Sequence, residues 1–247
     1  MQGELERALA SICGEAIRLA AAGRTDAGVH ATGQVISFRS ATGLDAATIG
    51  RGVNALLPAD IAVRGLDEAD EAFHARFSAT GRTYEYRIRN APQREPLERH
   101  REHWLPQPLD IEAMRRATAL LPGRHDLSAF ALGPPRELSE RRDQRLRLPG
   151  GWRAGERTIV RAEWLQEGTL LRSVIEADGF LRGMVRAIVG TLIWVGRGTI
   201  TVERFSEVIA SHDRTQAGPN APPHGLCLVG VAYGGERRRE TADEEEG

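Results

Sequence analysis

The strongest constraint on the fold is a stretch rich in proline and charged residues, Pro92 to Pro108, which separates two runs of helix-like and strand-like segments. In the first run, two segments have the spacing of apolar residues that is typical of helices, and four others are typical of strands. The expected helices are 3–13 and 46–56, and the expected strands are 16–21, 34–39, 61–66 and 83–89. The first run therefore predicts a unit that mixes helices with strands.

The second run has the same mixed character. Asp110 is a suitable cap for a helix that continues to about Leu121, and Glu167-Gly168 between two strand-like segments predicts a hairpin. The expected strands are 158–166, 169–177 and 226–233, and the expected further helices are 180–195 and 202–211. We therefore predict an α+β protein. Its expected parts are an N-terminal half (1–92), a crossing segment (93–109), a C-terminal half (110–235) and a charged, disordered tail (236–247).

Composition indicates an ordinary soluble globular chain of 247 residues, with 41% hydrophobic and 27% charged residues. The two cysteines, Cys13 and Cys227, are far apart and form no disulfide framework, which is typical of a reducing compartment. The longest apolar run, 187–195, is too short for a bilayer core of about 30 Å. The acidic N-terminus lacks the pattern of a signal peptide. We therefore expect a cytoplasmic protein that does not associate with membranes.

The basic residues are all Arg, 33 of them, and there is no Lys. Walker-type phosphate loops and Schiff-base catalysis both need a lysine, so the sequence excludes both. The net charge of −1 argues against a polyanionic partner. However, the stretch from Arg136 to Arg161 holds eight Arg against four acidic residues, while the tail that follows Glu236 ends in an acidic run. This uneven distribution leaves a nucleic-acid partner open.

The segment with the most candidate catalytic side chains is 23–34, GRTDAGVHATGQ. Its three glycines mark a loop in which the backbone turns sharply or approaches a ligand. Asp26 could be a nucleophile, but Asp is also a common turn residue. His30 could be a base or an ordinary surface imidazole, and Arg24 could simply pair with Asp26. Composition alone leaves these alternatives open.

Three blocks together carry a resemblance to a known family. The string GRTDAGVHATGQVISF, from Gly23 to Phe38, closely resembles the signature of the TruA family, the tRNA pseudouridine synthases that act on the anticodon stem-loop. The block FHARFSATGRTYEYRI (73–88) resembles the next family block, and DGFLRGMVRAIVGTL (178–192) resembles its C-terminal helix motif. The blocks occur in the family's order, and the resemblance spans residues 1–234.

The resemblance implies a reaction and a fold. In this family the N-glycosidic bond of a uridine breaks, the base rotates and a carbon–carbon bond forms, so no cofactor and no metal ion is implied. The implied substrate is tRNA, with uridines at positions 38–40 as the targets. The implied fold is the pseudouridine synthase fold, two ferredoxin-like halves around a largely antiparallel sheet, and the implied assembly is a homodimer.

The resemblance also assigns site residues. It implies that Asp26, in the N-terminal half, is the catalytic nucleophile; a carboxylate suits this role because it is ionised at neutral pH and can leave again. Whether it attacks the ribose or the uracil ring stays open. Tyr84 stands at the family's active-site tyrosine, where a phenol can stack on uracil or move a proton, and Tyr86 is a lesser candidate. Arg24 is expected to bind the RNA around the extruded uridine.

Arg186 corresponds to the Arg of the family's helix motif, and we count it with Tyr84 and Arg24 as substrate-binding. On a helix it would share a stripe with Arg182 and Val189, beside an apolar face. A half-buried guanidinium needs a carboxylate partner, so we expect Arg186 to pair with Asp26 and to keep it ionised and oriented.

Two other functions and one departure from the family stay open. A non-catalytic RNA-binding module would fit the Arg-rich stretch, and a nucleoside hydrolase would use Asp26 but would need a second acid in reach. His100 and His103 have no further partner cluster that would make them metal ligands.

Family members begin with a strand and a Gly-Trp-Gln loop, whereas this chain opens inside the first helix, so we expect the natural protein to start upstream of Met1.

Overall fold

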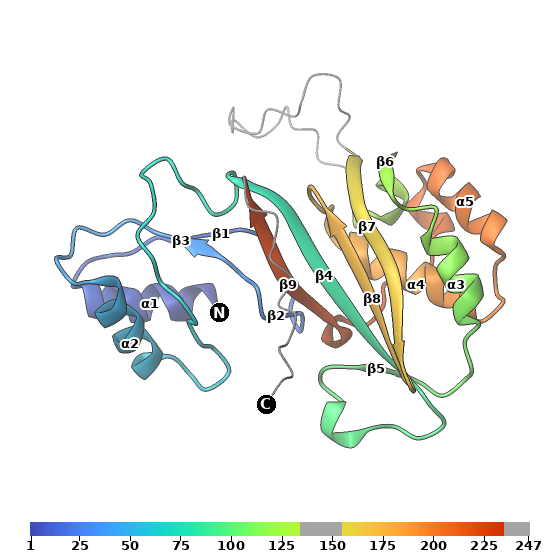
Figure 1. Cartoon of the computed structure of the whole chain (residues 1–247), viewed down its shortest axis with the longest axis horizontal. Coiled ribbons are helices and arrows are strands. Elements are labelled where there is room, and N and C mark those ends of the chain that lie inside the picture. The colour runs from blue at the N-terminus through green and yellow to red at the C-terminus, as the bar shows by residue number, and fades with distance from the viewer. Residues whose placement is uncertain (134–154, 235–247) are drawn as a thin grey trace, which may run out of the picture. The chain divides into compact units, whose positions relative to one another are not determined.

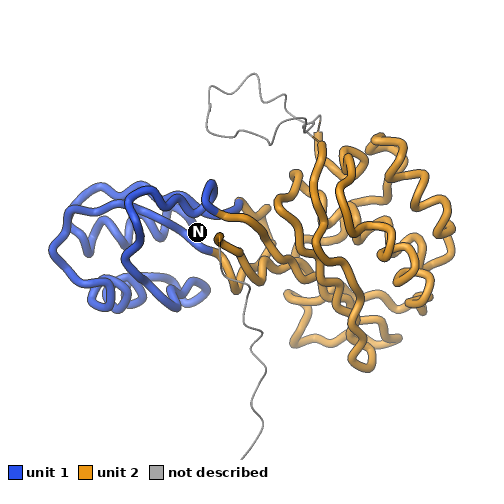
Figure 2. Tube along the Cα trace, turned by 45° about the horizontal axis from the view of Figure 1, so that its top comes forward, with its two compact units in different colours: residues 1–23, 35–78 blue, residues 24–34, 79–247 orange. Residues whose placement is uncertain are grey.

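The computed structural model describes residues 1–133 and 155–234. Contacts divide the chain into two compact units, which Figure 2 colours separately: unit 1 is 1–23 with 35–78, and unit 2 is 24–34 with the residues from 79 on. The expected crossing, 93–109, lies within unit 2, and the expected domain boundaries stay a prediction. The expected tail, 236–247, and most of the Arg-rich stretch lie outside the described residues.

Unit 1 contains two helices and a two-stranded antiparallel sheet. The helices are α1 (Gln2–Cys13) and α2 (Ala46–Leu56), and the strands are β1 (Ala20–Ala21) and β3 (Ile36–Ser37). Buried apolar side chains of both helices form its core, which includes Leu9 and Val53. The Asp45 side chain accepts a hydrogen bond from the Thr48 amide at 2.7 Å and caps α2. Both expected helices are confirmed, whereas the two strands are shorter than expected.

The expected strand at 61–66 is wrong. This segment belongs to no sheet, because a side chain takes the place of a neighbouring strand. The Asn54 side-chain amide donates to the Val63 backbone carbonyl through Nδ2, and it accepts from the Val63 backbone N–H through Oδ1, both at 2.7 Å. The backbone groups of Val63 are thereby satisfied without a partner strand.

Unit 2 is built on a seven-stranded sheet whose order is β2-β9-β4-β8-β7-β6, with β5 also paired to β4 (Figure 1). The strands are β2 (His30–Ala31), β4 (Ala79–Asn90), β5 (His103–Leu105), β6 (Gly123–Asp126), β7 (Glu156–Glu167), β8 (Leu170–Ala177) and β9 (Leu226–Tyr233). The pairs β2–β9 and β4–β5 are parallel and the other four are antiparallel. The expected mixed fold with a largely antiparallel sheet is confirmed.

Three helices cover one face of this sheet (Figure 1). They are α3 (Ile111–Thr118), α4 (Met184–Gly196) and α5 (Val202–Ser211). In the described residues the connections also contain short 3₁₀ helices: η1 (Pro96–Glu98), η2 (Ser128–Phe130), η4 (Arg214–Gln216) and η5 (Pro223–Gly225). Eleven of the thirteen residues of α4 are buried, as expected for a central helix that is apolar on most sides. Among the described residues, no helix combines the length and the apolar character that a membrane span needs.

The sequence located several of these elements closely. The hairpin of β7 and β8, the cap of α3 by Asp110, helix α5 and strand β9 are confirmed. Helix α4 begins at Met184, four residues later than expected, because Gly183 has a left-handed φ of 71° that interrupts the helix. The short strands β2, β5 and β6 had not been expected.

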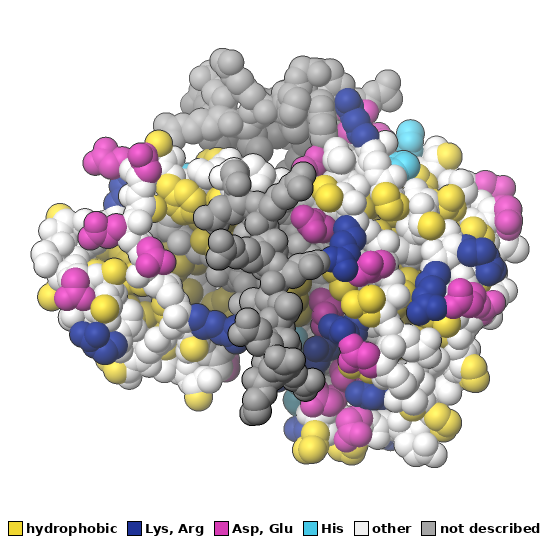
Figure 3. Space-filling model, viewed as in Figure 1, with side chains coloured by type: hydrophobic (Ala, Val, Ile, Leu, Met, Phe, Trp, Pro, Cys, Tyr) yellow, Lys and Arg dark blue, Asp and Glu magenta, His cyan; other side chains and the backbone are white. Residues whose placement is uncertain are grey.

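Charged side chains on the visible face of unit 2 are intermixed in sign (Figure 3). Ion pairs also form within unit 2. Arg172 lies 3.2 Å from Glu85 and also pairs with Glu167, and Arg87 lies 2.7 Å from Glu85. Arg172 and Arg87 thus each have an acidic neighbour within the fold.

The segment between α5 and β9 packs unusually close to α4, at Gly190. A methyl group at this position would lie 1.7 Å from the Pro219 carbonyl oxygen. We therefore expect Gly190→Ala to push the segment away and to lower the free energy of unfolding by about 3 kcal/mol, measured by urea denaturation. Gly50→Ala in α2 is the control, because a methyl group there has only an ordinary contact at 3.9 Å. Gly50→Ala should stabilise by about 0.5–1 kcal/mol, and a stable Gly190→Ala variant would contradict this packing.

Candidate active site

The loop that carries Asp26, residues 24–34, is fixed to strand β9; we call it the site loop. The Val29 amide donates to the Asp26 carbonyl at 3.1 Å, which closes a turn, and Gly28 has a φ of 81°. The amides of Thr32 and Gly33 both donate to the Leu228 carbonyl, at 2.9 and 3.0 Å. A methyl group at Gly33 would lie 2.3 Å from the neighbouring backbone of β9. Glycine therefore allows both the turn and the close approach.

The expected contact between Asp26 and Arg186 is present. Arg186 Nη1 lies 3.2 Å from Asp26 Oδ2. The Arg186 side chain is 17% exposed and that of Asp26 is 36% exposed, so the pair lies at the edge of the buried region. Arg186 Nε donates to the Ala221 carbonyl at 2.7 Å. The guanidinium is thus held from two sides, while the carboxylate stays accessible.

Tyr84 lies in β4, between β8 and β9, and is 9% exposed. Its ring contacts Phe180 edge-on, with 5.0 Å between the ring centroids. Burial raises the pKa of the Tyr84 phenol; the charge of Arg82 opposes this shift and that of Asp26 adds to it. The phenol is therefore protonated at neutral pH, and it can donate a hydrogen bond or a proton.

Tyr86, the lesser candidate, has no access to a ligand. It is fully buried, and its hydroxyl donates to the Pro222 carbonyl at 2.9 Å. Burial raises the pKa of Tyr86 well above its usual value, against the opposing charge of Arg186. The Tyr86 side chain therefore has a structural role, through its hydrogen bond to Pro222.

The remaining sequence candidates lie at the surface. The Arg24 side chain is exposed and makes no hydrogen bond or ion pair with any residue in the described ranges. His30 is also exposed, and its Nε2 donates to the His100 carbonyl at 2.6 Å. Burial, His224 and Arg197 together lower the pKa of His103 to about 4, so its ring is neutral at neutral pH. Within the described part of the chain, no group of three or more His, Cys, Asp and Glu side chains is arranged to hold a metal ion.

The segment from Ala217 to Gly225, which we call the brace segment, supports the site and had not been expected to do so from the sequence. The Ala221 carbonyl accepts from Arg186, and the Pro222 carbonyl accepts from Tyr86. A methyl group at Gly28 of the site loop would lie 3.1 Å from the Pro223 side chain, so the two segments also pack against each other. Its two glycines and three prolines indicate only a loop. The functional groups are backbone carbonyls, which no residue type reveals.

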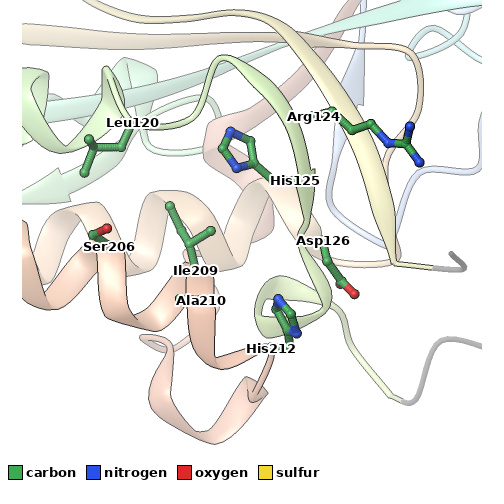
Figure 4. A pocket seen from close by; sticks show the side chains of 8 residues that line it. All are labelled: Leu120, Arg124, His125, Asp126, Ser206, Ile209, Ala210 and His212. Carbon is green, nitrogen blue, oxygen red and sulfur yellow. The ribbon is translucent and has the colours of Figure 1, made fainter. Parts of the chain in front are cut away.

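A separate cavity of about 510 Å³ lies in unit 2, near β6 and α5 (Figure 4). It is lined by Leu120, Arg124, His125, Asp126, Ser206, Ile209, Ala210 and His212. Arg124 already pairs with Glu156 at 2.7 Å, and the Asp126 carboxylate accepts from the amide and the hydroxyl of Ser128. None of the expected site residues lines this cavity, so it is distinct from the Asp26 site.

The chain is similar in sequence to known proteins along most of its length. Residues 117–234 match a family model described as tRNA pseudouridine synthase. Over 233 residues the chain is 45% identical to tRNA pseudouridine synthase A of Chloroflexus aurantiacus, covering 94% of this chain and 80% of the relative. It is 42% identical to the protein of the same name from Neisseria gonorrhoeae, covering 95% and 83%. It is also 42% identical to that of a Geobacillus species, covering 94% and 88%.

Proposed function

The chain belongs to the tRNA pseudouridine synthase A family, isomerases that convert uridine to pseudouridine, and we propose that it isomerises uridines of the tRNA anticodon stem-loop with Asp26 as the nucleophile. The observation that carries this proposal is the accessible Asp26 carboxylate, paired with Arg186 at 3.2 Å in the site loop. The target uridines are those at positions 38–40, which the family resemblance implies.

In the proposed mechanism Asp26 forms a transient covalent bond to the uridine, either at the ribose or at the uracil ring. The N-glycosidic bond breaks, the detached base rotates, and its carbon 5 bonds to the ribose. The proton at carbon 5 is then lost, a proton returns to the ring nitrogen, and the Asp26 carboxylate is released unchanged. Atoms and electrons balance within the uridine, so the reaction needs no oxidant and no cofactor.

Two neighbours assist this step. Arg186 fixes the direction of the Asp26 carboxylate, because its planar guanidinium donates to one carboxylate oxygen at 3.2 Å. Tyr84 is protonated, so it can contact the bound uracil or move a proton during the exchange at carbon 5. Both residues act on the same uridine that Asp26 attacks.

Arg24 is proposed to hold the RNA open. A uridine in a stem must leave the base stack before a side chain can reach its glycosidic bond. Arg24 is exposed and lies two residues before Asp26, so its guanidinium can take the vacated place or bind a nearby phosphate.

We also propose that the enzyme acts in the cytoplasm, where its tRNA substrate occurs, and that it works as a homodimer. A tRNA is long enough to contact both subunits of such a dimer. The division into halves 1–92 and 110–235 with a crossing at 93–109 belongs to the same proposal. Sedimentation with and without tRNA would test the dimer.

The proposed function predicts pseudouridine in an unmodified tRNA transcript after incubation with the purified chain. We expect the product at uridines 38–40, detected by pseudouridine-specific chemical modification and primer extension. A matched transcript with cytidine at these positions should gain none. Pseudouridine elsewhere would contradict the proposed target, free uracil would indicate a hydrolase, and tight tRNA binding without any product would indicate an RNA-binding module.

A further inference from the structure

We propose, on the basis of the function proposed above, that Thr191 is a positioning residue: its hydroxyl holds the brace segment in place, and the brace segment orients Arg186 toward Asp26. Thr191 does not touch the site itself. Its effect passes through backbone groups of the brace segment.

The first step in this connection is the Thr191 hydroxyl. Thr191 lies in α4 and is fully buried. Its Oγ1 donates to the Ala187 carbonyl at 2.7 Å and accepts from the Gly218 amide at 2.8 Å. A buried amide without an acceptor is costly, so this hydroxyl is the group that satisfies Gly218.

The second step is the tight packing of the brace segment on the helix. A methyl group at Gly218 would lie 2.9 Å from the Thr191 backbone, and one at Gly190 would lie 1.7 Å from the Pro219 carbonyl oxygen. Backbone therefore packs directly on backbone here. Because the residues between Gly218 and Ala221 are tightly packed, a displacement of the Gly218 backbone should also displace the backbone of Ala221.

The third step joins Ala221 to Arg186. The Ala221 amide donates to the Arg186 carbonyl at 2.9 Å, and Arg186 Nε donates back to the Ala221 carbonyl at 2.7 Å. A guanidinium is planar, so a fixed Nε direction also fixes the plane that contains Nη1. Nη1 is the atom that lies 3.2 Å from Asp26.

The brace segment also supports the other member of the pair. The Pro222 carbonyl accepts from the Tyr86 hydroxyl at 2.9 Å, and Pro223 packs against Gly28, two residues after Asp26. One segment therefore determines the position of both Arg186 and the site loop. Displacements of about 1 Å at such distances can cost about a hundredfold in rate.

The test begins with Thr191→Val, which keeps the shape and removes the hydroxyl. We expect kcat for pseudouridine formation to fall about tenfold with little change in the KM for tRNA, because no RNA contact is lost. Thr191→Ser keeps the hydroxyl and should restore kcat. Thr118→Val is the matched control: Thr118 is equally buried, and its hydroxyl accepts from Trp164 at 3.0 Å, without a bond to the brace segment.

A double-mutant cycle separates positioning from a general loss of stability. Lysine at position 186 has no Nε–H donor, so the brace segment cannot orient it through Ala221. Thr191→Val should therefore have almost no further effect on kcat in the Arg186→Lys background, whereas any effect of Thr118→Val should be unchanged there. Equal effects of Thr191→Val in both backgrounds, or an equal fall in kcat for Thr118→Val, would overturn the inference.

A second measurement does not depend on activity. The Arg186 Nε–H, bonded to a carbonyl and largely buried, should give a slowly exchanging NMR signal that Arg186→Lys removes. Thr191→Val should broaden or shift this signal, while Thr118→Val should leave it in place. If the wild-type chain made no pseudouridine, the proposed function would fail, and this signal would still decide the role of Thr191. An unchanged signal in Thr191→Val would refute that role.

Discussion

Replacement of Asp26 by Asn is expected to abolish pseudouridine formation, with a fall in kcat of about 10⁴-fold or more, as is typical when a nucleophile is removed. The amide has nearly the same shape as the carboxylate, but it is neutral and cannot form a covalent bond that later breaks cleanly. Binding of tRNA should change little, because Asp26 contributes one partly exposed side chain to a large polar interface.

The fold should tolerate this change. An Asn side-chain oxygen can still accept from Arg186 Nη1, and the turn at Asp26 uses its backbone carbonyl. The pair is partly exposed, so the free energy of unfolding should change by no more than about 1 kcal/mol. Thermal denaturation in parallel with the activity assay checks this expectation.

Two further variants make the experiment decisive. An Asn side chain can deamidate to Asp and so restore a carboxylate. Asp26→Ala cannot do this, and we expect it to be equally inactive. Asp110→Asn is the matched control, because Asn also caps helices well and Asp110 only caps α3. It should keep both activity and stability. Normal activity of Asp26→Asn in fresh protein would end the nucleophile hypothesis.

The elements that the sequence located best are those whose signals are local. Helix α5 and strand β9 have the expected bounds, because apolar periodicity and neighbouring turn residues suffice to define them. The Asp110 cap could be predicted because a carboxylate at the start of a helix can accept from the amide three residues later, here that of Ala113. The start of α4 was misjudged, since the apolar pattern continues past a left-handed Gly183.

The elements that the sequence missed depend on partners far away in the chain. Strands β2 and β5 have two and three residues, too few for any alternation, and they exist because they pair with β9 and β4. Conversely, the segment 61–66 has the composition of a strand but lies in no sheet, and the Asn54 side chain takes the place of a partner strand. Pairing geometry decides such segments, and local propensity does not.

The site shows the same division. The contact between Asp26 and Arg186 followed from the resemblance together with the need of a half-buried guanidinium for a carboxylate. The brace segment could not be inferred, because Ala221 and Pro222 act through their carbonyl groups. Tyr86 follows Tyr84 on the same face of β4 and was the lesser candidate. The structure shows that it is fully buried and bonded to the Pro222 carbonyl, which the alternation along the strand does not reveal.

Arg186→Ala is expected to leave a folded protein whose kcat is lower by about 10³-fold, the second largest effect after the loss of Asp26 itself. Without the guanidinium, Asp26 loses its positively charged neighbour and the hydrogen bond that fixes its direction. Ala221 also loses the donor for its carbonyl. Arg186→Lys keeps the charge without the planar fork, so its kcat should fall less, by about a hundredfold.

Stability measurements separate this effect from a simple structural defect. The Asp26 carboxylate is 36% exposed, so water can replace the lost partner, and the loss of stability should stay near 1–2 kcal/mol. Arg204→Ala in α5 is the control, because Arg204 forms an exposed pair with Glu207 at 2.7 Å that contributes little. An Arg186→Ala variant with full activity would show that Asp26 needs no positive neighbour. An Arg186→Ala variant that fails to fold would show that the guanidinium supports the brace segment more than it supports the carboxylate.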